Sequence, residues 1–308
     1  MQIVERLDMV LTDRMCADHL TTTMSKAEKG ASRAGAPDSK TATEVDALIG
    51  SDFPLGEYKM DHKRRGLALI FNQETFGCQK MTRSGTNIDR DNLEIRFKAL
   101  NFDVQAHQDL TRVDILAKIS EAAQADHVDS DCFVCVFLSH GENDKVWAHD
   151  QEISIDEVTD NFKGDKCRSL VGKPKIFILQ ACRGREFDLP VTGMAGDSDD
   201  EEEEQVVADD GVFHTLPAGA DFLMCYSVAK GYFSFRDTIN GSWYIQDLCK
   251  TLEGYGGSRE FTELLTLVNS KVCKRSVEKS RIPDAIGKKQ FPCFASMLTK
   301  NLFFRPKQ

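Results

Sequence analysis

The chain has 308 residues, of which 41% are hydrophobic and 29% charged, and it carries a formal net charge of −10. A chain of this length can bury the core of one or two domains. No stretch approaches about 18 uninterrupted apolar residues, and charged residues break the apolar run at the N-terminus, so neither a membrane span nor a secretory signal is expected. We therefore expect a cytoplasmic protein that binds no membrane.

The negative charge is concentrated in one segment. Within 185–213, eleven residues are acidic and one is basic, so this segment alone nets −10 and the rest of the chain is balanced. Such a segment does not pack into a core, and long loops of this kind are usually functional or disordered. We predict a protease-accessible linker between two halves of one sheet, and we expect no nucleic acid to bind there.

Residues 1–57 lack a sustained core pattern. Small and polar residues dominate 21–43, which is typical of a mobile segment. We therefore predict a mobile N-terminal arm outside the folded core.

The ten cysteines are scattered, and several lie inside apolar segments. There a free cysteine packs like a small hydrophobic residue, and disulfides are not expected in a reducing compartment. Cys132 and Cys135 have the spacing of a metal-binding pair, but side chains three apart in a strand face opposite ways and no second pair follows. We expect neither a metal nor any other cofactor.

The predicted elements alternate between strands and helices along the chain. Strands are expected over 66–72, 103–107, 132–138, 175–180, 221–227 and 295–304. Helices are expected over 91–100, 111–125, 153–162, 242–252 and 260–277. Thr111 should cap the second helix, because Asp114 follows three residues later. This alternation predicts an α/β fold with a mostly parallel sheet and helices on both faces.

Two predicted strands each end in one half of a candidate nucleophile. Strand 175–180 leads to Cys182, and strand 132–138 leads to His140 and Gly141. Taken singly, a buried cysteine or a structural histidine is the commoner role, but parallel strands place their carboxyl ends together. An imidazole can take the proton of a thiol, which attacks carbonyls as the thiolate. The backbone N–H groups of Gly141 and Cys182 are candidate donors to the oxyanion.

The segment 180–184, Gln-Ala-Cys-Arg-Gly, resembles the active-site pentapeptide of caspases. Other stretches resemble executioner caspases as well, namely 82–86, 139–141, 216–227 and 241–248. The resemblance covers about residues 58–307 and is nearest to the six type, while 82–86 is more similar to the three and seven types. It implies a caspase-like fold, in which large and small subunits build one six-stranded sheet. It also implies an aspartate-specific cysteine endopeptidase of the executioner type that acts in apoptosis.

Cleavage after aspartate requires a pocket that compensates for the desolvation of a buried carboxylate, and guanidinium groups meet this need best. By the resemblance, this S1 pocket is lined by Arg83, Gln180, Ser234 and Arg236. Arg183, beside the nucleophile, is expected to have a supporting structural role. The resemblance also implies that a backbone carbonyl near Met81 or Thr82 supports the histidine.

The resemblance places an apolar S2 wall at Phe233 and Phe235 and the border of S4 at Trp243. Alternatively, these aromatic residues fill core. Asp237 stands where the three type has Asn and the six type an acid, while Phe235 departs from both types. An acid near S4 should repel an aspartate at P4, so we predict weak P4 selection or a preference for Val or Thr.

The resemblance further implies a zymogen with an arm over 1–57, a large subunit over 58–196, a linker over 197–212 and a small subunit over 213–308. Asp46 ends a Thr-Glu-Val-Asp sequence after which the arm would be cut. In the linker, small residues follow Asp197 and Asp210, and we favour Asp210. Cutting the linker would free the active-site loops to order.

The expected partners are protein substrates, peptide-like inhibitors, an upstream initiator caspase and a second copy of the chain. The last predicted strand, 295–304, is an apolar edge, and the family's two-fold homodimer covers such an edge. An arm of about 46 residues is too short for a recruitment domain, which favours an executioner. Lys59 and 63–65 could serve nuclear entry, although a solvated basic rim is the favoured interpretation.

Two alternatives stay open from the residues. A related peptidase that cuts after Arg or Lys would need an acidic pocket, against which Arg83 and Arg236 argue. An inactive decoy that dimerises with an active relative would lack Cys182 or His140, and both are present.

Overall fold

The computed structural model describes residues 55–77, 80–142, 144–190, 218–280 and 282–307. The predictions for the N-terminal arm with Asp46, and for the linker with Asp197 and Asp210, lie outside these ranges. Within the described ranges, no helix is both long and apolar enough to cross a membrane.

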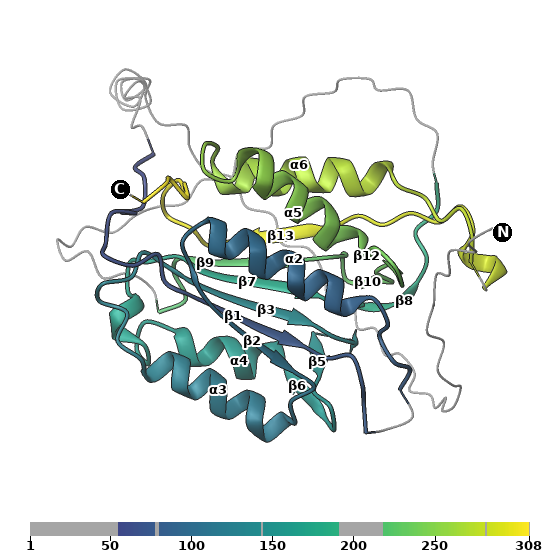
Figure 1. The fold of residues 1–308 in the computed structure, drawn as a ribbon, viewed down its shortest axis with the longest axis horizontal. Coiled ribbons are helices and arrows are strands. Elements are labelled where there is room, and N and C mark those ends of the chain that lie inside the picture. The colour runs from purple at the N-terminus through teal and green to yellow at the C-terminus, as the bar shows by residue number, and fades with distance from the viewer. Residues whose placement is uncertain (1–54, 78–79, 143, 191–217, 281, 308) are drawn as a thin grey trace, which may run out of the picture. The chain divides into compact units, whose positions relative to one another are not determined.

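A six-stranded sheet forms the centre of the fold, with the strand order β13-β9-β7-β3-β1-β2 (Figure 1). Neighbouring strands from β2 to β9 run parallel, and β13 is antiparallel to β9. The strands are β1 (Leu67–Asn72), β2 (Asp103–Gln108), β3 (Phe133–Leu138), β7 (Lys175–Gln180), β9 (Phe222–Tyr226) and β13 (Cys293–Ser296). The predicted fold class is confirmed.

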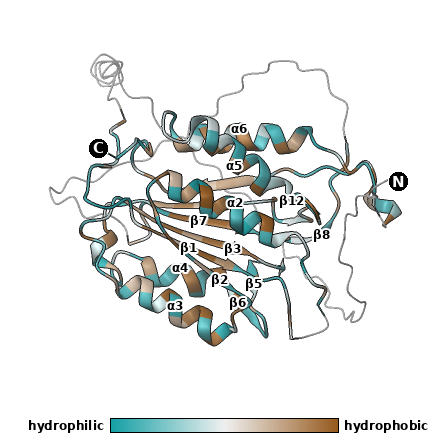
Figure 2. Ribbon diagram, viewed as in Figure 1, coloured by the Kyte–Doolittle hydropathy of each residue, from teal (hydrophilic) through white to brown (hydrophobic). Residues whose placement is uncertain are grey.

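Helices cover both faces of the sheet because its central strands are apolar on both sides. Every residue of β3 and of β7 is buried, as expected for parallel strands between two helical layers. One face carries α2 (Thr86–Ala99), α5 (Trp243–Tyr255) and α6 (Phe261–Lys274), and the other carries α3 (Arg112–Gln124) and the short α4 (Ile155–Thr159). Figure 2 shows the central strands as mostly hydrophobic, whereas the helices mix hydrophobic and hydrophilic residues.

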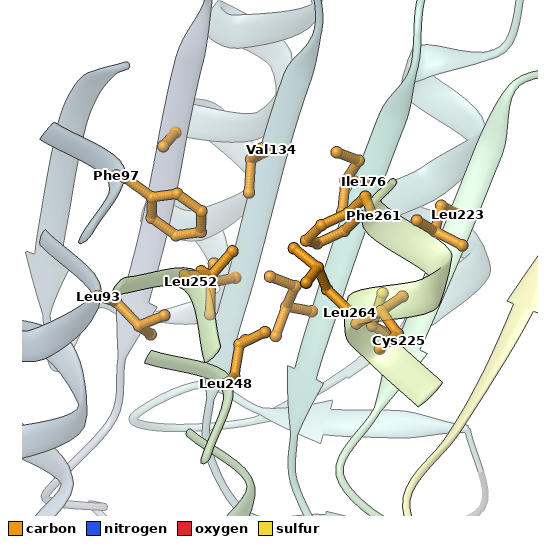
Figure 3. Close-up of a cluster of buried hydrophobic side chains, with 14 of the residues drawn as sticks. Leu93, Phe97, Val134, Ile176, Leu223, Cys225, Leu248, Leu252, Phe261 and Leu264 are labelled. Atoms are coloured by element: carbon orange, nitrogen blue, oxygen red, sulfur yellow. The ribbon is translucent and has the colours of Figure 1, made fainter. Parts of the chain in front are cut away.

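The first of the two large cores lies between the sheet and the α2, α5 and α6 layer. Figure 3 shows how α5 and α6 contribute Leu248, Leu252 and Phe261, which pack on Val134 and Ile176 of the central strands. These contacts join residues from before and after the acidic linker. The two halves of the chain therefore share one core as well as one sheet.

The single sheet also spans the two sides of the linker. β7, before the linker, pairs with β9, after it, and Ile176 lies opposite Leu223. The prediction of one sheet built from both halves is confirmed by this pairing. As a result, the residues that follow β7 lie next to the segment that follows β9.

Several predicted elements differ from the structure in their bounds. The helix expected over 91–100 begins earlier, at Thr86, after Gly85 in a left-handed conformation. Thr111 caps α3 as predicted, since its side chain accepts from the Asp114 N–H. The helix expected over 153–162 begins at Ile155 and ends as a 3₁₀ turn, Asp160–Phe162.

The strand predictions contain errors of two kinds, namely short strands that were not predicted and one strand that was predicted too long. The three-stranded antiparallel sheet of β4 (Gly141–Glu142), β5 (Lys145–Trp147) and β6 (Glu152–Ser154) was not predicted. The strand expected over 295–304 is wrong beyond Ser296, because β13 spans only Cys293–Ser296. The apolar residues that suggested a longer strand, Leu302 and Phe304, instead enter the core.

Cys132 and Cys135 are not placed where they could bind one metal ion together. Both Cys132 and Cys135 are completely buried, and they contribute to different cores on opposite faces of the sheet. Among the described residues, no group of three or more potential metal ligands was found.

Candidate active site

The candidate nucleophile pair lies at the carboxyl ends of β3 and β7. The pairing of these strands continues one step beyond their ends, since the Ser139 N–H donates to the Gln180 carbonyl over 3.1 Å. Gly141 then approaches the chain at Cys182 so closely that a Cβ there would lie 2.8 Å from the Cys182 carbonyl oxygen. The structure therefore brings His140, Gly141 and Cys182 together, and glycine is the residue that permits this approach.

The His140 ring is held by a backbone carbonyl. Its Nε2 lies 2.7 Å from the Met81 oxygen, and because a carbonyl only accepts, Nε2 carries the proton and Nδ1 is left as the basic nitrogen. The ring also packs against Phe76, with centroids 4.7 Å apart. Burial, together with the positive charge of Arg83, lowers the pKa of His140 to about 3, so the imidazole is neutral near pH 7.

The Cys182 thiol lies 3.9 Å from the Ser234 carbonyl oxygen, a weak S–H···O contact. Burial raises the pKa of this thiol, while the Ser234 contact and the charges of Arg83 and Arg236 act to lower it. The raised pKa of the thiol and the lowered pKa of the imidazole both favour the neutral forms of Cys182 and His140. A neutral imidazole is able to accept a proton, as a general base must.

Arg83 is a buried guanidinium, only 1% exposed. Its Nη1 donates to the Thr86 hydroxyl over 2.7 Å and to the Gln73 carbonyl over 3.2 Å. Among the described residues, no carboxylate lies within ion-pair distance of it. Burial and the nearby Arg236 guanidinium lower the pKa of Arg83. A buried charge is usually compensated by a partner, so this one is suited to an anionic ligand.

The other residues predicted for the S1 pocket lie beside Arg83 and Cys182. Arg236 donates from Nε to the carbonyl of Ser84, over 3.0 Å. Gln180 donates to the Ser234 hydroxyl over 2.8 Å, and its amide oxygen is buried with no partner among the described residues. Two arginines, an amide and a hydroxyl thus converge next to the thiol.

Comparisons with known proteins agree with this arrangement. A family model described as Caspase domain matches residues 65–303. Caspase-6 of Mus musculus is 59% identical over 272 residues, which cover 86% of this chain and 99% of that protein. Caspase-6 of Gallus gallus is 55% identical over 280 residues, or 88% and 91% of the two chains. Caspase-3 of Mesocricetus auratus is 43% identical over 249 residues, or 80% and 86%.

This chain belongs to the caspase family. It is a cysteine endopeptidase that cleaves after aspartate, and its high identity to Caspase-6 over most of its length makes it an executioner caspase of the apoptotic type. Caspases act on protein substrates and assemble as dimers. The family and the enzyme class expected from the sequence are confirmed, and the lower identity to Caspase-3 agrees with the six type.

The aromatic residues expected around S2 and S4 of this caspase lie close together, and their side chains are buried from solvent. Phe233, Phe235 and Trp243 are all buried, and the Phe235 and Trp243 rings are 5.0 Å apart. Phe187, which sequence reasoning missed, packs against Phe233 with centroids 4.8 Å apart. Phe235 and Trp243 form a small third core with Val277, and Phe187 packs against it. The structure therefore favours a packing role, and their place as S2 and S4 borders stays a prediction.

Asp237 stabilises the turn between β11 (Arg236–Asp237) and β12 (Gly241–Ser242). One carboxylate oxygen accepts from the N–H groups of Ile239, over 2.7 Å, and Asn240, over 3.1 Å. The other accepts from the Asn240 side chain over 3.1 Å. These hydrogen bonds to the carboxylate thus come from its own turn. The repulsion predicted for an aspartate at P4 would therefore act through the charge of Asp237.

Arg183 has the structural contacts expected of a supporting residue. Its guanidinium donates to Asp144 over 2.8 Å and lies 3.8 Å from the centroid of the Tyr226 ring. Asp144 also accepts from Lys230 over 2.7 Å, and these two cations hold the pKa of Asp144 below its ordinary value. The segment after Cys182 is therefore tied to the segment that follows β9.

One further residue of the site carried no sequence signal. Asp89 lies on α2, completely buried, and accepts from the Ser242 N–H over 2.8 Å and the Ser242 hydroxyl over 2.6 Å. A single aspartate near the start of a helix is ordinary, because acids favour the first turn. Only its distant partner on β12 distinguishes it.

Proposed function

We propose that Cys182 is the nucleophile of this caspase and His140 its general base. The thiol would pass its proton to Nδ1 of His140 as the sulfur attacks the scissile carbonyl. The N–H groups of Gly141 and Cys182 would stabilise the oxyanion. Collapse to a thioester expels the amine, which takes the proton from His140, and water then hydrolyses the thioester and restores the thiol.

We further propose that Arg83, Arg236, Gln180 and Ser234 bind the aspartate at P1. The observation that carries this is the buried Arg83 guanidinium, whose described partners are all neutral. A substrate carboxylate would compensate this charge, and a bidentate contact would favour aspartate over its amide.

A fluorogenic peptide assay on the full-length protein tests both proposals. The wild type should cleave peptides that end in aspartate, and Cys182→Ala should reduce cleavage to background while the protein stays folded. Arg83→Ala should abolish cleavage without removing the nucleophile. Full activity in Cys182→Ala would overturn the catalytic proposal, and cleavage after Lys or Arg would overturn the proposed pocket.

We also propose that this caspase is a zymogen activated by cleavage of the linker after Asp210 or Asp197, with the arm cut after Asp46. The support lies in the segment that leads from Cys182 toward the linker. β8 (Gly184–Glu186) pairs with β10 (Gly231–Tyr232), close to Ser234 and Arg236. At Gly184 a Cβ would lie 2.2 Å from the backbone of Gly231. A cut beyond β8 would therefore act on the segment that carries the proposed pocket.

A double variant, Asp197→Ala with Asp210→Ala, tests this activation. We expect the chain to stay uncut and activity to fall at least about tenfold. Full wild-type activity from an uncut chain would contradict the zymogen proposal.

The proposed partners are a second copy of this caspase, an upstream initiator caspase and peptide-like inhibitors. β13 ends the sheet, and its outer residues Ala295 and Ser296 are exposed, so this edge is the proposed dimer interface. We place the enzyme in the cytoplasm with access to the nucleus. Sedimentation of the full-length protein should show a dimer that Ala295→Lys weakens, and an unchanged dimer would exclude this edge.

A further inference from the structure

We propose that Asp89 is a positioning residue of the P1 pocket. It holds the β11–β12 hairpin that carries Arg236 against the turn that carries Arg83, and its negative charge offsets both guanidinium groups without occupying them. This inference rests on the proposed P1 site.

The hairpin is fixed to Asp89 through Ser242. Both carboxylate oxygens accept from this one residue, over 2.8 Å from its N–H and 2.6 Å from its hydroxyl. Ser242 lies opposite Arg236 in the β11–β12 pairing. The bond therefore fixes the strand next to the arginine, and Asp89 acts on Arg236 through the hairpin.

Two glycines allow the hairpin and the start of α2 to approach this closely. At Gly241 a Cβ would lie 2.2 Å from Oδ1 of Asp89, and at Gly85 a Cβ would lie 2.6 Å from the Asp237 carbonyl oxygen. Arg236 adds a bond in the same interface, from Nε to the Ser84 carbonyl. The elements that carry the two arginines are thus joined by close contacts at Gly85 and Gly241 and by the Arg236 bond to Ser84.

The charge of Asp89 acts on both arginines from beyond contact distance. Among the described residues, its hydrogen-bond partners both belong to Ser242, and it forms no ion pair with Arg83. Burial raises the pKa of Asp89 to about 6, against the opposing effect of Ser242, Arg83 and Arg236. In turn its charge raises the pKa of Arg83, while Arg236 lowers it. A counter-charge placed there reduces the repulsion between the arginines, while both hydrogen bonds that the carboxylate accepts come from Ser242.

A merely structural role makes a different prediction. Burying a carboxylate is costly even when it is hydrogen-bonded. A residue that only held the hairpin could do so through hydrogen bonds and would not need the negative charge. If Asp89 served stability alone, an amide of the same shape would replace it with little change in substrate binding.

Asp89→Asn separates the two roles, because it keeps an acceptor for the Ser242 N–H and removes the charge. We expect KM for a peptide with P1 aspartate to rise about tenfold while kcat changes less than about threefold. The melting temperature should stay within about 3 °C of the wild type. A wild-type KM, or a loss of activity that only follows a loss of folded protein, would overturn the proposal.

Ser242→Ala is the second variant, since it keeps the charge and removes the hydroxyl bond. A rise in KM of about threefold at constant kcat supports the positioning role, and a wild-type KM contradicts it, even if Asp89→Asn does not fold. Arg83→Ala, measured with the same peptide, distinguishes a failure of the proposed P1 pocket from a failure of the role proposed for Asp89. If Arg83→Ala cleaves the peptide as well as the wild type, the proposed P1 pocket is wrong. If Arg83→Ala loses activity but Asp89→Asn has a wild-type KM, the P1 pocket stands and only the role proposed for Asp89 is wrong.

Discussion

The two ends of the parallel sheet each bury an arginine, and only one of these arginines is paired with a carboxylate. At the amino ends of the strands, Arg65 is 1% exposed and lies 3.0 Å from Asp131. Lys307 also pairs with Asp131, and the Arg65 guanidinium donates to the carbonyls of Leu100 and Arg305. At the carboxyl ends, Arg83 is equally buried, but its described partners are neutral.

This difference distinguishes the structural charge of Arg65 from the charge of Arg83, which we propose binds the substrate. At the amino ends, the cations and the carboxylate compensate one another, and the cluster joins the C-terminal tail to the start of β1. At the carboxyl ends, compensation is incomplete without a ligand. The same residue type at the same burial therefore has opposite consequences when it is removed.

The largest expected effect is on catalysis and concerns Arg83. Arg83→Ala should lower kcat/KM for P1-aspartate peptides by at least about a thousandfold, because the substrate carboxylate would enter the pocket uncompensated. Stability should stay constant or rise, since a desolvated charge is removed. Steady-state kinetics measure kcat/KM, and thermal unfolding measures the stability. A large loss of stability in Arg83→Ala would contradict the contrast drawn between Arg83 and Arg65.

Arg65→Ala should show the reverse. It removes the arginine beside the buried Asp131 and should lower the free energy of unfolding by about 3–5 kcal/mol. Enzyme that remains folded should keep a near-normal kcat/KM. Denaturant unfolding with kinetics below the transition tests this, and a catalytic defect in fully folded enzyme would contradict it.

The resting thiol should respond to pH as a neutral group. Because the pKa of Cys182 is raised and that of His140 is lowered to about 3, iodoacetamide should alkylate the uncut Asp197→Ala, Asp210→Ala protein faster as pH rises. The rate should increase about tenfold per unit between pH 6 and 8, as the thiolate fraction grows. A rate independent of pH over this range would reveal a thiolate–imidazolium pair and contradict the neutral state.

The smallest expected effect concerns P4. The charge of Asp237 should make VEID and TEVD peptides at least as good as DEVD, and Asp237→Asn should shift the ratio toward DEVD by about threefold. Asn is the matched change because it can keep the acceptor for the N–H groups of Ile239 and Asn240. A tenfold advantage of DEVD in the wild type would contradict this prediction.

The sequence predicted best where one strong pattern decided the structure. β7 has the predicted bounds, Lys175–Gln180, because a short continuous apolar run bounded by turn residues is typical of a buried strand. β4, β5 and β6 were missed because strands of two or three residues have no periodicity. The strand after Ser296 was wrong because apolar side chains such as Leu302 can enter a core without backbone pairing.

The candidate site shows the same limit. Cys182, His140 and Arg83 could be predicted because reactive side chains and a family motif mark them. The Met81 carbonyl that holds the His140 ring is backbone, so its residue type carries no signal, and only the family resemblance pointed to a carbonyl near Met81 or Thr82. Asp89 is fixed by Ser242, 153 positions away, and such a contact appears only when the sheet is folded.

The claim that Arg83 is left for a substrate carboxylate is tested most directly by two peptides that differ only at P1. We predict that the wild type cleaves VEID at least about a thousandfold better than VEIN, measured as kcat/KM, because the asparagine amide cannot compensate the guanidinium charges. In Arg83→Ala this ratio should fall toward unity. Comparable cleavage of the two peptides by the wild type, or an undiminished ratio in Arg83→Ala, would contradict the account.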